Sequence, residues 1–228
     1  MAKSTITWLG HSCFLIETNG ASILIDPFLA DNPVATMKSE ELDPDVIILT
    51  HGHVDHVADA APIAMRAGSL VVSTFEVCNW MEKQGVTQTH AMNHGGSHKF
   101  EFGVVKFTQA VHSSSMPDGS YGGEPAGVLL KLIDGTIFHA GDTALFSDMK
   151  LIGEEGIDIA ILPIGDNYTM GLTDAVRAAE FLQAKRVIPC HYNTWEVIAQ
   201  DGKAFASKLR EVTGFEGVIL KVGESVEI

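Results

Sequence analysis

Thr50-His51-Gly52-His53-Val54-Asp55-His56 is the stretch that decides the fold and chemistry of this 228-residue chain. It follows Val46 to Leu49, an unbroken apolar run that is typical of a strand buried on both faces. In an extended segment His51 and His53 point to the same side, so they can share one metal ion. Asp55 and His56 lie beyond the turn that the glycine permits, within reach of a second ion about 3.5–4 Å away. Imidazole and carboxylate ligands without a thiolate suit Zn, Mn, Fe or Ni.

Other candidate ligands stand where further predicted strands end. Asp26 follows a strand at Ser22–Ile25, His112 follows Val104–Val111, Asp142 follows Thr136–His139, and His191 follows Arg186–Pro189. The loops beyond the carboxyl ends of strands are where α/β folds assemble their sites. The order and placement of these residues therefore predict one metal site assembled from distant parts of the chain.

The rest of the pattern alternates short strands with helices, as in α/β proteins. Further strands are expected at Ile6–Leu9, Cys13–Glu17, Leu70–Ser73, Val128–Ile133 and Ile159–Leu162, and helices at Asp59–Arg66, Thr74–Gln84, Thr173–Gln183 and Lys203–Val212. Asp59, Thr74 and Thr173 are the expected N-caps. The loop Ser113–Pro125, rich in serine and glycine, is irregular and is expected to shape a pocket.

Charge and composition narrow the classes of partner. Fifteen basic residues against 29 acidic ones give a net charge of −14, which argues against binding to nucleic acid or to anionic lipid. No apolar run approaches the roughly 18 residues that a membrane helix needs. The three cysteines cannot all pair, and the first residues do not resemble an export signal, so we expect a cytoplasmic protein with reduced thiols.

Several histidines and one cysteine are assigned no chemistry. His90, His94 and His98 recur every four residues, but Gly95-Gly96 makes a helix improbable, so solvated loop histidines are expected. His139 is expected to be a packed or paired core residue, and Cys190 a buried thiol.

The ordered set Asp26, His51-His53-Asp55-His56, His112, Asp142 and His191 resembles the five motifs of the metallo-β-lactamase superfamily, over essentially the whole chain. Within it, Ile6–Ser12 and Ile188–Thr194 are similar to small stand-alone metal-dependent hydrolases related to sugar-phosphate lactonases. The resemblance implies an α/β fold with a four-layer αββα sandwich: two mixed sheets face to face, helices outside, in a single domain over residues 1–228. It implies a first metal on His51, His53 and His112, and a second on Asp55, His56 and His191. Asp142 would bridge the two, and Asp26 would support a ligand from behind.

The resemblance also assigns chemistry. Two divalent ions, with Zn favoured and Mn, Fe or Ni as alternatives, would activate a hydroxide that cleaves a small ester. A phosphodiester or a lactone, with or without a phosphate, is the expected substrate. Catalytic roles fall to Asp55, Asp142 and His11, the last as a substrate contact, as a donor to a ligand, or as a merely structural histidine. Asn167, Tyr168 and Asn193 are candidate substrate contacts, as is Thr194.

Other interpretations of the same ligands stay open. A di-iron redox or oxygen-handling protein would use a similar set on the same fold, and a metal buffer or sensor would use it without catalysis. A small-molecule substrate, neither nucleic acid nor membrane as partner, and association into a homo-oligomer complete the expectations.

Overall fold

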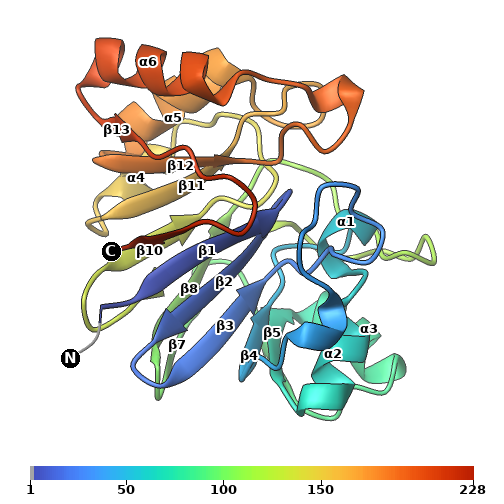
Figure 1. Ribbon diagram of the computed structural model, residues 1–228. Helices are drawn as coiled ribbons and strands as arrows, with labels where there is room; N and C mark the ends of the chain where they lie inside the picture. Colours follow the sequence, from blue (N-terminus) through green and yellow to red (C-terminus); the bar gives the residue numbers. More distant parts are fainter. Residues whose placement is uncertain (1–2) are drawn as a thin grey trace.

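Two mixed sheets of seven strands each form the framework of the computed structural model, which describes residues 3–228 (Figure 1). In the first sheet the strand order is β14-β1-β2-β3-β4-β5-β6, and in the second it is β13-β12-β11-β10-β9-β8-β7. The first sheet contains β1 (Thr5–Gly10), β2 (Cys13–Thr18), β3 (Ala21–Ile25), β4 (Val46–Ile48), β5 (Leu70–Thr74), β6 (Thr89–Met92) and β14 (Ser225–Glu227). The second contains β7 (Ser97–Phe100), β8 (Gly103–Gln109), β9 (Ala126–Lys131), β10 (Thr136–His139), β11 (Ile159–Pro163), β12 (Arg186–Cys190) and β13 (Glu216–Gly217).

Helices cover the outer sides of the sheets and connect the parallel strands. They are α1 (Val54–Val57), α2 (Ala60–Ala67), α3 (Phe75–Lys83), α4 (Met149–Gly153), α5 (Leu172–Leu182) and α6 (Gly202–Thr213), with 3₁₀ turns η1 (Ser39–Glu41) and η2 (Glu196–Ile198). Figure 1 shows α2 and α3 beside β4 and β5, and α5 and α6 beyond β11 and β12. The expected α/β sandwich with helices outside two mixed sheets is confirmed.

The alternation of side chains along the strands divides the core into two layers. Ile25 and Ile48 face the second sheet and belong to the large cluster that also contains Phe107 and Phe138. Leu24 and Ile47 point the other way, into a smaller cluster beneath α2 and α3. The first sheet is thus buried on both faces, which is why β4 is an unbroken apolar run. All the parallel pairs leave their carboxyl ends at a common edge of each sheet.

Two of the expected N-caps do not cap their helices: Thr173 lies inside its helix, and the carboxylate of Asp59 has other partners. Helix α5 begins at Leu172 with Gly171 as its N-cap, so the prediction that Thr173 caps it was wrong. Asp59 does precede α2, but its carboxylate accepts hydrogen bonds from the backbone of Leu29 and Ala30, at 2.7 and 3.1 Å, instead of capping the helix. It anchors the loop after β3 to the helix.

The histidine-rich segment after α3 forms two strands that the sequence did not predict. His90 lies on β6 and His98 on β7, at the edges of the two sheets, with ring centroids 4.2 Å apart. The expectation of loop histidines was therefore wrong for these two residues. His94 does lie in the connecting turn, where its Nε2 is 2.9 Å from the carbonyl oxygen of Pro125.

His139 and Cys190 are both buried, as expected. His139 is fully buried, with its Nε2 3.1 Å from the Ser12 carbonyl oxygen, as expected of a paired core residue. Cys190 is buried as a free thiol.

Over residues 3–228, no helix combines the length and the apolar character that crossing a bilayer requires.

Candidate metal centre

Eight histidine and aspartate side chains converge at the edge where the carboxyl ends of the strands meet. We call them the His/Asp cluster: His11, His51, His53, Asp55, His56, His112, Asp142 and His191. Strand β4 ends shortly before His51, and the chain then turns into α1, which carries Asp55 and His56. The structure therefore brings together all seven predicted ligands and adds His11.

The first group within the cluster consists of His51, His53 and His112, whose nearest ring nitrogens all lie within 4.8 Å of one another. His51 Nε2 lies 3.0 Å from His53 Nδ1, and the His53 and His112 rings are nearly perpendicular, with centroids 5.1 Å apart. These are the three residues that the resemblance assigns to the first metal.

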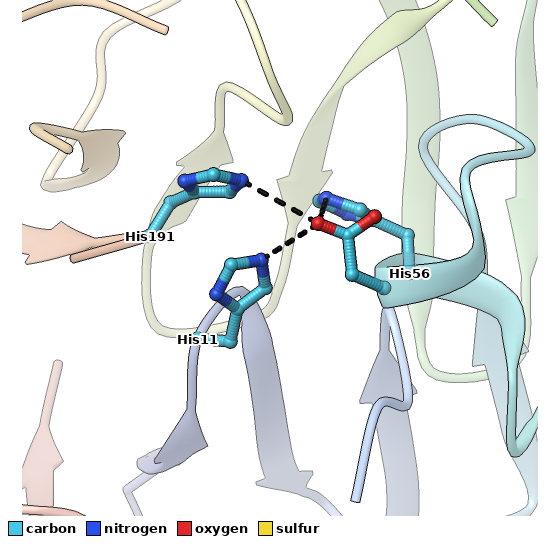
Figure 2. A group of neighbouring side chains, drawn as sticks. His11, His56 and His191 are labelled. Carbon is cyan, nitrogen blue, oxygen red and sulfur yellow. Dashed lines mark hydrogen bonds and ion pairs between the residues drawn. The ribbon is translucent and has the colours of Figure 1, made fainter. Parts of the chain in front are cut away.

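The second group contains Asp55, His56, His191 and His11. Figure 2 shows the imidazoles of His11, His56 and His191 pointing toward one carboxylate oxygen. Asp55 Oδ2 lies 3.1 Å from His11 Nε2 and 3.8 Å from His191 Nε2. His56 Nε2 is 4.0 Å from the same oxygen. The residues that the resemblance assigns to the second metal are thus adjacent, with His11 beside them.

Asp142 connects the two groups. Its Oδ2 lies 3.0 Å from His191 Nε2, 3.4 Å from His56 Nε2 and 3.6 Å from His112 Nε2. Together with His51 and His56, Asp142 also forms a set of side chains that could hold one metal ion. A carboxylate in this position can contact ions on both sides, as a bridging role requires.

Asp26 lies behind the cluster and accepts two side-chain hydrogen bonds. His56 Nδ1 lies 2.8 Å from Asp26 Oδ2, and the Thr50 hydroxyl donates to the same oxygen at 2.6 Å. The Thr50 hydroxyl oxygen lies 2.9 Å from His51 Nδ1. Since the carboxylate can only accept, His56 donates through Nδ1, and Thr50, having donated its proton, accepts from His51. His51 therefore presents an unprotonated Nε2 to the cluster, and His56 does so in its neutral form, the form that binds a metal ion.

His11 is held from both sides. Its Nδ1 lies 2.8 Å from the Thr194 hydroxyl and its Nε2 3.1 Å from Asp55 Oδ2. The backbone of His11 has φ +54°, and its carbonyl accepts a hydrogen bond from the backbone N–H of His191. His11 is thus fixed against Asp55 by the loop after β1 and by the loop after β12.

Burial and charge set the protonation states that a metal site needs. Burial lowers the pKa of His51 well below the ordinary value of 6.5 and that of His11 to about 4. Burial alone would raise the pKa of Asp142, but His191 and His56 outweigh it and hold that pKa well below 3.8. Neutral imidazoles beside an ionised carboxylate are the forms that bind metal ions. Burial opposes a charge on His56, yet Asp142 and Asp26 raise its pKa, because the two carboxylates favour a positive charge between them.

Several buried polar atoms of the cluster have no hydrogen-bond partner, which indicates whether metal ions fit there. Among the described residues, His56 Nε2, His191 Nε2 and Asp142 Oδ1 are buried and lack a hydrogen-bond partner. An unsatisfied buried polar atom is costly, and such atoms gathered in one place indicate a missing shared partner. Nitrogen and oxygen ligands at these spacings fit divalent transition metals, so the residues of the cluster can hold such ions.

A pocket of about 290 Å³ opens onto the cluster and admits solvent to it. Its walls include His53, Asp55, Asp142, Ser113, Tyr168 and Trp195. Of the predicted substrate contacts, Tyr168 lines this pocket, while Asn167 is exposed beside it. Asn193 Oδ1 accepts a hydrogen bond from the backbone of Gln200 at 2.8 Å, which closes its own loop.

Sequence reasoning missed Trp195 and the role of Thr50. Trp195 packs edge-on against His11, with ring centroids 5.0 Å apart, and also contacts Phe28. Thr50 directly precedes the histidine motif in the sequence, and a hydroxyl at this position could have been expected to contact an imidazole. No local pattern marks Trp195, because only the fold of its loop brings it to the pocket.

Comparison with known proteins places this geometry in a family. Residues 5–191 match the beta-lactamase superfamily domain. A UPF0173 metal-dependent hydrolase of Bacillus cereus is 52% identical over 229 residues, covering 98% of this chain and 99% of that protein. A metallo hydrolase from the hyperthermophilic archaeon Ignicoccus hospitalis has a TM-score of 0.91 at 32% identity, covering 100% of this chain and 99% of its own.

A more distant structure supports the fold alone. The metallo-beta-lactamase fold protein YhfI from Bacillus subtilis has a TM-score of 0.78 at 18% identity, with 100% of both chains covered. The resemblance drawn from the sequence motifs is therefore confirmed. Carrying the His/Asp cluster at the expected edge of two face-to-face sheets, the chain belongs to the UPF0173 family of metal-dependent hydrolases, within the metallo-β-lactamase superfamily.

Proposed function

We propose that this protein uses two divalent cations, zinc in the first instance, to hydrolyse an ester bond of a small molecule. The observation that carries the proposal is the position of Asp142, with Oδ2 within 3.6 Å of nitrogens from both groups of the cluster. One carboxylate between two sets of imidazoles suits two ions better than one. A closed structural site would keep no open position, whereas the pocket leads directly to this cluster.

The side chains of the cluster have distinct tasks under this proposal. His51, His53 and His112 would hold one cation, and Asp55, His56 and His191 the other, with Asp142 contacting both. When bound, such ions lower the pKa of water toward neutrality and polarise the bond to be cleaved. Asp26 and Thr50 keep His56 and His51 in the tautomer that presents Nε2 to the cluster.

His11 is the residue best placed to control Asp55. With its pKa near 4, His11 is neutral at pH 7, so Nε2–H donates to Asp55 and Nδ1 accepts from Thr194. A carboxylate fixed in this way can receive a proton from the attacking water and release it to the leaving oxygen. We therefore assign His11 a positioning role and Asp55 the proton transfer.

The nature of the substrate is also a proposal. A pocket of about 290 Å³ suits a small molecule, for which we consider a phosphodiester or a lactone. The net charge of −14 supports a small-molecule substrate over nucleic acid or an anionic membrane. A cytoplasmic location and assembly into a homo-oligomer complete the proposal.

A screen with metal-reconstituted protein tests it. Protein stripped with a chelator and reloaded with Zn²⁺ or Mn²⁺ should hydrolyse at least one of a set of phosphodiesters, lactones and aryl esters. Asp55→Ala should abolish this turnover, and Asp31→Ala, which changes an exposed aspartate outside the cluster, should leave it unchanged. Equal activity in Asp55→Ala, or no turnover of any ester by the loaded protein, would overturn the proposal.

A further inference from the structure

The loops around the His/Asp cluster carry almost no positive charge. They comprise residues 26–42, 49–53, 110–125, 140–148, 164–171 and 191–201, and Lys38 is their only lysine or arginine. Lys38 is exposed and lines a different hollow, together with Leu29 and Asn32. The same loops contain acidic residues outside the cluster, among them Asp118, Asp166 and Glu196. Among the charged side chains of these loops, none but Lys38 is a permanent cation, so the bound cations would be the main source of positive charge at the pocket.

A phosphate remote from the bond being cleaved needs a cationic partner of its own. Proteins recognise such groups with arginine forks, lysines or the N-termini of helices. The cations would compensate charge on the reacting group, but they cannot also neutralise a phosphate at the far end of the substrate. The lining of the pocket away from the cluster is Ser113, Tyr168 and Trp195. None of these side chains compensates a dianion.

Two aromatic side chains provide the apolar surface of the pocket. Trp195 is 37% exposed, and its ring is backed by Phe28 and His11, with centroids 6.0 and 5.0 Å away. Tyr168 is 57% exposed and follows Asp166 and Asn167, both with positive φ, in the turn after β11. Exposed aromatic rings beside a reactive centre favour a flat apolar partner, because burying them removes apolar area from water.

We propose that the site takes an uncharged ester, a lactone or aryl ester whose apolar or aromatic part lies against Trp195 and Tyr168, and that it discriminates against phosphorylated substrates. This inference rests on the proposed hydrolase function and, of the lactones with or without a phosphate that it considers, selects those without one. The reaction is hydrolysis: the bond between acyl carbon and oxygen breaks, water supplies hydroxyl to the acyl carbon, and its other proton goes to the leaving oxygen. Trp195 and Tyr168 are then the residues that determine specificity.

A matched pair of lactones separates the two substrate classes. We would compare 3,4-dihydrocoumarin with its 6-phosphate on zinc-loaded protein, since the two differ only in a phosphate remote from the carbonyl. The neutral lactone should have a kcat/KM at least tenfold higher. Equal or higher kcat/KM for the phosphate ester would overturn the inference while leaving the hydrolase function intact.

A binding measurement keeps the inference testable even if neither lactone is turned over. The corresponding lactams, 3,4-dihydroquinolin-2-one and its 6-phosphate, are not readily hydrolysed, and their Kd values are measurable by calorimetry on zinc-loaded protein. The neutral lactam should bind at least tenfold more tightly. Tighter or equal binding of the phosphorylated lactam would contradict the inference, whereas failure of turnover alone would contradict only the proposed function.

Substitution of Trp195 tests the aromatic contact. Trp195→Ala should raise the KM for dihydrocoumarin, and the Kd for its lactam, about tenfold, with kcat changed less than twofold. Trp195→Phe should recover most of the loss. Ile133→Ala, which removes a 67% exposed apolar side chain in the turn between β9 and β10, away from these loops, is the control and should change neither value. Zinc content is measured for each variant, because Trp195 contacts His11. Unchanged KM and Kd in Trp195→Ala with full zinc content would exclude the contact.

Discussion

Asp26 and His56 form a fully buried pair, with the carboxylate Oδ2 2.8 Å from the imidazole Nδ1. The same carboxylate reaches His51 through the Thr50 hydroxyl. One acidic side chain, placed by the end of β3, therefore fixes the tautomer of one histidine from each group of the cluster. This is the arrangement by which outer side chains orient metal ligands and raise their basicity.

Replacement of this carboxylate should weaken metal binding. In Asp26→Asn the amide nitrogen donates toward groups that are themselves donors, so His56 and His51 lose their fixed tautomers. We expect zinc affinity to fall by about 10- to 100-fold, measured by competition with a chromophoric chelator. Asp45→Asn is the control, since Asp45 accepts hydrogen bonds from Ser22 far from the cluster. Affinity equal to that of the parent protein would show that Asp26 does not support the ligands.

Removal of the hydroxyl behind His11 should slow catalysis without removing metal. Thr194→Val keeps the volume but deletes the donor to His11 Nδ1, so His11 no longer holds Asp55 in one orientation. We expect kcat on an ester substrate to fall about tenfold with KM and zinc content nearly unchanged. Thr7→Val, at a surface hydrogen bond with Ser225, serves as control. A rise in KM alone would indicate that Thr194 contacts substrate instead.

Gly141 is constrained by close packing beside Asp142. Its φ is +61°, and an added Cβ would lie 2.8 Å from the Ala126 carbonyl oxygen and 3.0 Å from the Thr50 side chain. Gly141→Ala should therefore lower the free energy of unfolding by about 2–4 kcal/mol and displace Asp142, weakening zinc binding. Gly20→Ala shares a positive φ, +81°, but meets no atom within 4 Å, so it isolates the cost of the backbone conformation. Equal losses in the two variants would exclude the packing argument.

The ion pairs of Glu155 should stabilise the folded protein at neutral pH and lose this effect in acid. Lys106 and Lys131 both donate to its carboxylate and hold its pKa below the ordinary value of 4.5. Because the folded-state pKa is lowered, the stabilisation is complete above about pH 4.5 and is lost as the pH falls through the folded value. Glu155→Gln should thus cost up to about 1 kcal/mol at pH 7 and progressively less below pH 4.5.

Urea unfolding at pH 7 and pH 3.5 checks this prediction. Adding 1 M NaCl at pH 7 should reduce the difference between Glu155→Gln and the parent protein, because salt screens the ion pairs. Glu154→Gln changes the exposed neighbour and should have no effect at either pH. A difference that grows on acidification would show that the lysines are not its cause.

The sequence predicts the elements around the cluster well because they are buried. The expected range of β10, Thr136–His139, matches the structure, and the β4 prediction is longer by one residue. Strong apolar runs ending in histidine or aspartate specify both a strand and the position of a ligand. The seven predicted ligands meet for this reason, although they come from distant parts of the chain.

The features that the sequence did not predict are those set by tertiary contacts. Strands β6 and β7 lie at sheet edges, and their polar residues and neighbouring glycines show no period. Asp59 accepts a hydrogen bond from the backbone of Leu29, and no local sequence pattern predicts this contact. Trp195 and Asn193 occur in one irregular loop, and only the fold distinguishes the ring that lines the pocket from the amide that closes the loop.

The measurement that tests the central claim most directly combines ion stoichiometry and turnover in one titration. Chelator-stripped protein is titrated with Zn²⁺, and native mass spectrometry and hydrolysis of a responsive ester are recorded at each point. We predict two ions per chain, with activity rising as the second binds, and a single ion with little activity in His191→Ala. Full hydrolytic activity in the metal-free protein, or activity complete at one ion per chain, would contradict the account.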